Sequence, residues 1–236
     1  MPKSNHSNAV YRIGFWSALL TALLSIAWAA AFAFQFSTAS QGPWGGVEET
    51  VQSFNFVTDM INLVFALPLS WTFVVMMVSV HFFVPEDKKI WTMIGLAFAI
   101  IYAVMANINY LIQLVTVRAS LLARETEGLG LFVSDNMHSV FWALANSYAI
   151  QSIGLFFAAW AIEGGRPARW IRGLWIAVGV TTPFQFAFSL GLIPMAIAFP
   201  VLGVWIVGIP LSTVLLAALF RHMERLHPQL ISTHQP

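Results

Sequence analysis

The apolar residues of the chain fall into six long, nearly continuous runs, which short polar segments separate. The runs cover residues 13–36, 56–83, 91–117, 137–162, 170–190 and 195–220. Each run is long enough for a helix to cross a hydrocarbon core of about 30 Å. Because apolar positions do not alternate with polar ones, helices are favoured over strands. The pattern predicts an all-α fold: a single domain, residues 1–236, built as an integral membrane bundle of six transmembrane helices.

The composition of the 236 residues agrees with this prediction. Apolar residues make up 58% of the chain and charged residues 9%, against about 45–50% and about 25% in an average soluble domain. The net charge of +1 leaves no basic face for nucleic acid. The absence of cysteine from the sequence excludes disulfides, thiolate nucleophiles and Cys-based metal sites. We therefore expect membrane lipid as a partner, no nucleic acid and no cofactor.

The 11 Lys and Arg residues are distributed unevenly between the predicted ends of the bundle. Most of them fall at one end, namely Lys3, Arg12, Lys88, Lys89, Arg166, Arg169, Arg172, Arg221 and Arg225. Arg118 and Arg124 fall at the other end. Since cytoplasmic segments of membrane proteins carry the excess of Lys and Arg, this asymmetry predicts that both termini are cytoplasmic. We expect the protein in a cell membrane, specifically a bacterial inner membrane.

Amide side chains recur within the apolar runs, where each needs a hydrogen-bonding partner. With two neighbouring residues they form the candidate ligand-binding site, which comprises Asn62, Asn107, Asn109, Gln113, His138, Trp142, Asn146 and Gln185. Helical spacing places Asn109 and Gln113 on one face, and it places His138, Trp142 and Asn146 on another. We hypothesise that the site is a pocket in the outer half of the membrane, open outward to a small polar or amphipathic molecule. The alternative is that these side chains only join helices by hydrogen bonds.

Three tryptophans, Trp28, Trp71 and Trp205, lie near the middle of their runs. A buried indole N–H needs a partner, and aromatic rings often form the walls of ligand cavities. Bulky packing in the core or against lipid is the alternative.

Carboxylates gather in the segments predicted to lie outside, and these are Glu48, Glu49, Asp59, Glu125, Glu127 and Asp135. They could form an acidic vestibule that attracts cations, or they could accumulate there because Lys and Arg are excluded. Asp59 is the only carboxylate within a run, so no acid–base pair is visible in the spans and an enzyme is not expected. His138 and Asp135 together would supply only two metal ligands, so no metal site is predicted.

One short segment resembles a known pattern. Residues Asn136 to Leu144 read Asn-Met-His-Ser-Val-Phe-Trp-Ala-Leu, which is similar to an N-x-H-x-x-F-x-A-L pattern of multi-span bacterial membrane proteins. The run from Asn109 to Leu114 is similar in character. The resemblance covers the chain from the third run onward and implies a helical-bundle fold, without an activity to carry over.

Three classes of function are compatible with the sequence. The first is binding or transport of a small amphipathic or hydrophobic molecule in the amide-lined pocket. The second is a structural or accessory subunit of a membrane complex, and the third is a membrane-embedded enzyme acting on a lipid-like substrate. The sequence leaves open whether the chain acts alone, as a homo-oligomer or within a complex.

Overall fold

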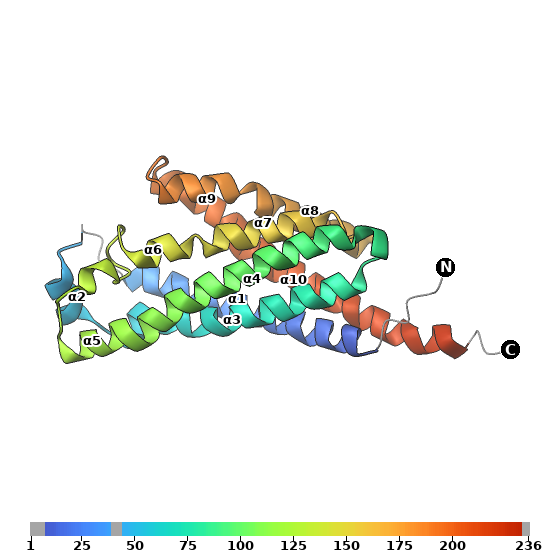
Figure 1. Ribbon diagram of the computed structural model, residues 1–236, viewed down its shortest axis with the longest axis horizontal. Coiled ribbons are helices and arrows are strands. Elements are labelled where there is room, and N and C mark those ends of the chain that lie inside the picture. The colour runs from blue at the N-terminus through green and yellow to red at the C-terminus, as the bar shows by residue number, and fades with distance from the viewer. Residues whose placement is uncertain (1–7, 39–43, 233–236) are drawn as a thin grey trace.

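The computed structural model describes residues 8–38 and 44–232, and within them the chain is helical without any strand (Figure 1). In chain order the elements are α1 (Asn8–Thr38), α2 (Val47–Ser53), α3 (Phe56–Phe83), η1 (Glu86–Lys88), α4 (Lys89–Leu111), η2 (Ile112–Val117), α5 (Arg118–Ala123), η3 (Leu129–Leu131), α6 (Val140–Ala145), α7 (Ser147–Ala159), α8 (Arg166–Val180), α9 (Thr182–Ser189) and α10 (Met195–Ser232). The predicted all-α fold is confirmed.

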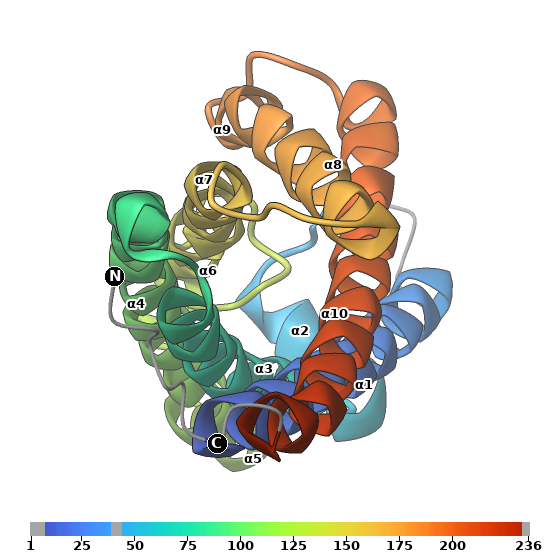
Figure 2. The same ribbon diagram turned by 90° about the vertical axis from the view of Figure 1, so that its right-hand side faces the viewer.

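The long helices form a closed ring in which α1, α3, α4, α7, α8 and α10 each pack on the next, and α10 packs back on α1. Figure 2 shows this ring along the bundle axis. Figure 1 shows α2 and α5 at one end, which we call the α2 end, and the start of α1 with the last turns of α10 at the other. We call the second end the basic end because Arg12, Lys88, Arg166 and Arg221 belong to elements that begin or end there.

Among the residues that the structure describes, five helical stretches are long and apolar enough to cross a membrane: Asn8–Thr38, Phe56–Phe83, Glu86–Ala123, Val140–Ala159 and Ala196–Leu226. Their outward faces carry large apolar side chains whose exposure to water would be unfavourable. Examples are Leu23, Ile26, Val104 and Val207, each about half exposed or more. Such faces fit contact with lipid tails. The architecture is therefore that of a helical membrane bundle.

The predicted run 170–190 departs from a single helix. The structure divides it into α8, with 15 residues, and α9, with 8, so neither part alone reaches the roughly 20 residues that a helix needs to cross a bilayer. Pro183 follows the break and has no N–H to donate to the carbonyl of Gly179. Thr181 stands at the break, and its hydroxyl donates to the carbonyl oxygen of Val178 at 2.6 Å.

The predicted run 137–162 also differs in detail. Its helix begins at Val140 with Ser139 as N-cap, so His138 lies in the preceding connection and shares no helical face with Trp142. The helix is interrupted at Asn146, between α6 and α7. There the amide of Asn146 donates to the carbonyl oxygens of Trp142 and Ala143, at 3.4 and 3.2 Å. The side chain thus occupies acceptors next to the point at which the helix is interrupted.

Small residues allow α4 and α7 to approach closely. A Cβ atom placed on Gly95 would lie 2.7 Å from the carbonyl oxygen of Gly154, and one placed on Gly154 would lie 2.9 Å from that of Gly95. Ala99 and Ala158 are fully buried at the same crossing. Close packing of small residues is a main source of helix association in membranes, where lipid is as apolar as the side chains.

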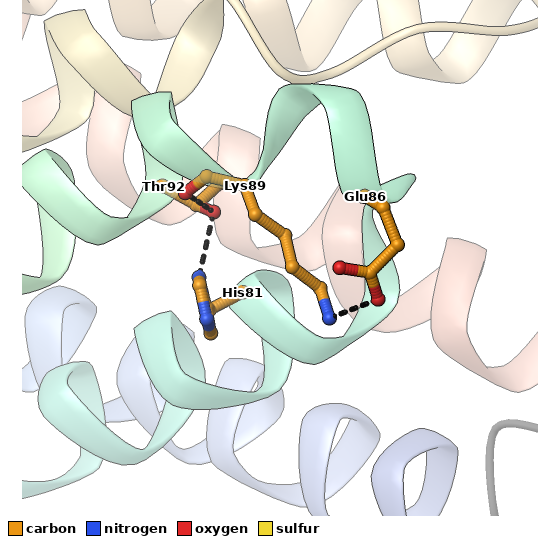
Figure 3. A network of polar contacts seen from close by, with 4 residues as sticks. All are labelled: His81, Glu86, Lys89 and Thr92. Carbon is orange, nitrogen blue, oxygen red and sulfur yellow. Dashed lines mark hydrogen bonds and ion pairs between the residues drawn. The ribbon is translucent and has the colours of Figure 1, made fainter. Parts of the chain in front are cut away.

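Polar contacts at the basic end fix the turns between helices. His81, in the last turn of α3, forms a hydrogen bond of 2.9 Å between its Nδ1 and the hydroxyl of Thr92, while Lys89 pairs with Glu86 (Figure 3). Lys88 reaches across to Glu163 in the α7–α8 connection at 3.0 Å. These contacts tie the α3–α4 turn to its neighbours, and they occupy His81 with a structural partner.

Candidate ligand cavity

A cavity of about 360 Å³ lies inside the ring toward the α2 end. Residues of α1, α3, α4, α6, α7, α9 and α10 line it, together with the connection that precedes α6. The volume is within the range of about 300–1,000 Å³ usual for small-ligand sites.

Aromatic rings make up the inner wall of the cavity. Trp28, Tyr148 and Trp205 form a mutual cluster with ring centroids 5.0 to 5.6 Å apart, and Phe32 stacks on Trp28 at 5.2 Å. The indole N–H of Trp205 donates to the side-chain oxygen of Gln151 at 3.2 Å. The cluster therefore presents ring faces and edges to the cavity, and one of its two buried indoles, that of Trp205, already has a hydrogen bond.

Asn62 lines the cavity and has a buried amide oxygen that lacks a hydrogen-bond partner. It lies on α3, is 6% exposed, and its amide oxygen has no hydrogen bond although it is buried. A buried acceptor left without a donor costs about 1–3 kcal/mol. Because Asn62 lines the cavity, a molecule bound there with a hydroxyl or amine group could supply the missing donor.

Other predicted residues line the cavity with their amides already engaged. Asn109 donates to the carbonyl oxygen of Phe141 at 3.2 Å, and Gln185 donates to the hydroxyl of Thr181 at 2.7 Å. The side-chain oxygen of Asn146 accepts from the hydroxyl of Ser189 at 2.7 Å. Trp142 also lines the cavity, and its indole N–H donates to the backbone oxygen of Ser134 at 2.7 Å.

The remaining predicted residues do not line the cavity. Asn107 joins α4 to α3, accepting from the indole of Trp71 at 2.7 Å and donating to the hydroxyl of Ser70 at 3.0 Å. Gln113 donates to the backbone oxygen of Phe132 at 2.7 Å, which ties the π-helical segment η2 to the connection after α5. His138 is exposed in the loop before α6. The sequence-based site is therefore divided: Asn62, Asn109, Trp142, Asn146 and Gln185 line one cavity, and the others join helices or lie at the surface.

Two carboxylates, Asp59 and Asp135, line the cavity from α3 and from the connection before α6. Asp135 is exposed along part of its side chain, but burial of its carboxyl against protein raises its pKa. The hydrogen bond from Thr50 lowers this pKa, and the negative charge of Asp59 raises it further. The two carboxylates therefore repel each other at the same part of the cavity.

Sequence reasoning missed several lining residues of α1. Phe32 and Gln35 follow Trp28 at spacings of four and seven, which places all three on one helical face. The amide of Gln35 donates to the backbone oxygen of Asp59 at 3.0 Å and so joins α1 to α3 beside the cavity. This stripe of two aromatic residues and one amide is the sequence pattern that could have identified the α1 wall of the cavity.

Comparisons with known proteins give no further guide. No protein-family model, no curated protein and no solved structure matches the chain. The cavity has to be interpreted from its own residues.

Proposed function

We propose that the protein binds or carries a small amphipathic or hydrophobic molecule in the cavity at the α2 end. The observation that carries the proposal is an aromatic-lined cavity with Asn62 in its wall, a residue whose buried amide oxygen has no hydrogen-bond partner. An apolar cavity with a few convergent polar groups is the usual form of a small-molecule site. A carboxylate–histidine pair, which would favour an enzyme, is not supported because His138 is outside the cavity.

A molecule from the membrane could reach the cavity through the side that lies between α1 and α10. Phe36 and Phe199 line the cavity there. Their rings pack edge to face, with centroids 5.0 Å apart. Both rings are also exposed at the protein surface, by 46% and 39%. In a membrane these exposed faces would meet lipid, so a molecule dissolved in the bilayer could enter by displacing two side chains.

The orientation that we propose has six membrane crossings, with both termini in the cytoplasm of a bacterial cell. The kinked pair α8–α9 would supply the crossing that is not a single long helix, since together the two span residues 166–189. The basic end would then face the cytoplasm, in agreement with the usual bias of Lys and Arg. The cavity would lie in the outer half of the membrane.

Cysteine labelling tests this orientation directly, because the chain has no cysteine of its own. We expect a membrane-impermeant maleimide to label Glu127→Cys and Leu192→Cys from outside intact cells, and Gly165→Cys only after the cells are opened. All three positions are exposed. Labelling of Gly165→Cys from outside intact cells would show that the orientation is the reverse of the one proposed. Labelling of Leu192→Cys only after the cells are opened would show that α8–α9 does not cross the membrane.

Replacement of Asn62 tests the ligand site. We expect Asn62→Leu to raise the free energy of unfolding of the empty protein by about 1 kcal/mol, because a buried amide without a partner is removed. The same variant should bind 10-bromo-1-decanol about fivefold more weakly, since the alcohol loses its hydrogen-bond acceptor. The measurements are thermal unfolding without ligand, and quenching of tryptophan fluorescence by the bromine in phosphatidylcholine nanodiscs.

Asn107→Leu is the matched control, because Asn107 is an amide of the same bundle that is bonded and outside the cavity. It should lower the free energy of unfolding by about 1 kcal/mol and leave binding of the probe unchanged. Wild-type quenching that rises without saturation, or equal probe affinity in Asn62→Leu and wild type, would contradict the proposed function.

A further inference from the structure

The charged residues that line the cavity are acidic, in contrast to the Lys and Arg residues of the basic end. Asp59 and Asp135 line it, whereas no Lys, Arg or His is among the described residues that do so. Within the part of the chain that the structure describes, ion pairs involve Glu86, Glu163 and Glu224, which all lie at the basic end. The carboxylates of the cavity therefore have no cationic partner there.

Neutral groups hold these two carboxylates in place. Asp59 accepts from the backbone N–H of Asn55 at 2.8 Å and from the hydroxyl of Thr58 at 2.7 Å. Asp135 accepts from the hydroxyl of Thr50 at 3.1 Å. Each carboxylate is thus oriented while its charge stays uncompensated, and a cation placed between them would remove their mutual repulsion.

Asn62 supplies an independent sign of a ligand next to this charge. It follows Asp59 on α3 by three residues, so the two side chains share one helical face about 4.5 Å apart along the axis. Its buried amide oxygen lacks a donor. A head group with several N–H donors could bond to both residues, while a single hydroxyl could satisfy only one of them.

The aromatic cluster lies beyond these acceptors and suits the rest of such a molecule. Trp28, Tyr148 and Trp205 offer apolar ring surface for an alkyl or aromatic body. Ring faces also attract cations. The cavity therefore combines negative charge at its polar side with apolar surface at its inner side.

We propose that the cavity selects amphipathic cations, with a protonated amine held between Asp59, Asp135 and the amide oxygen of Asn62, and an apolar body against the aromatic cluster. This inference rests on the proposed function, because it requires that the cavity binds ligands at all. It adds the class of ligand: a primary or secondary ammonium carried on a hydrophobic chain.

Competition among three ligands with the same ten-carbon chain tests the inference. Decylammonium, 1-decanol and decanoate would each displace 10-bromo-1-decanol from the protein in phosphatidylcholine nanodiscs at pH 8, with each concentration corrected for partition into lipid. We expect decylammonium to compete at about tenfold lower concentration than 1-decanol, as a charge-assisted hydrogen bond allows. Decanoate should compete least.

Two double variants identify the groups responsible. Asp59→Asn with Asp135→Asn keeps side-chain oxygens to accept the present hydrogen bonds, so it should remove the preference for decylammonium over 1-decanol. Glu48→Gln with Glu127→Gln removes the same charge from exposed positions outside the cavity, and it should preserve the preference.

The outcomes separate the two proposals. Absence of saturable binding of 10-bromo-1-decanol would overturn the proposed function. Saturable binding with equal competition by all three ligands would overturn only the selection of cations. Loss of the preference in the Glu48 and Glu127 variant as well would overturn the assignment to Asp59 and Asp135.

Discussion

Ala145→Phe combined with Ala198→Phe is expected to abolish saturable binding of 10-bromo-1-decanol, with a loss of affinity of at least about tenfold. Both alanines are half-buried and line the cavity, one from α6 and one from α10. Two phenyl rings would fill much of a volume of about 360 Å³. Filling a ligand cavity removes the ligand's apolar contacts without changing any hydrogen bond of the protein.

Ala143→Phe with Ala196→Phe provides the control. These alanines lie on the same two helices, are exposed, and do not line the cavity. The control adds the same apolar bulk on faces directed outward, so it should bind the probe like wild type. Thermal unfolding of both variants establishes that they fold. Equal binding by the two variants would place the probe outside the cavity.

The membrane-bundle architecture was predictable because it depends on the length and continuity of apolar runs. The predicted run 56–83 coincides with α3, although Pro68 lies within it. Pro183, by contrast, follows the break between α8 and α9. Both are prolines inside apolar runs, so the sequence alone does not distinguish them. What differs is the surroundings, since the hydroxyl of Thr181 bonds to Val178 and accepts from Gln185 at the break.

The amides of the site were predicted as a set, but the role of each one depends on side-chain direction. Asn109 and Gln113 are four residues apart, which places them on one face of an α-helix. The π-helical segment η2 begins at Ile112, and its wider turns change the direction of the residues that follow. Asn109 accordingly lines the cavity while Gln113 reaches the connection after α5. Hydrophobic periodicity carries no signal for such a local change.

Gly95→Val is expected to have the largest effect on stability, with a loss of about 2–3 kcal/mol in the free energy of unfolding. A Cβ atom at this position would lie 2.7 Å from the backbone oxygen of Gly154 and 3.0 Å from the Cβ of Ala158. The first of these neighbours is backbone, so relief requires α4 and α7 to move apart. Separation of the two helices would also open contacts made by the fully buried Ala99.

Gly173→Val tests whether valine at a helical glycine is harmful in itself. Gly173 lies in α8, is exposed, and a Cβ atom placed there would meet nothing within 4 Å. Its change in stability should stay within about 0.5 kcal/mol, as for most surface substitutions. Thermal unfolding of both variants, solubilised in one detergent, measures the change in stability. Of these two glycines, Gly95 alone is in close contact with the backbone of another helix. A similar loss in the free energy of unfolding at both positions would therefore show that the close α4–α7 crossing contributes no special stability.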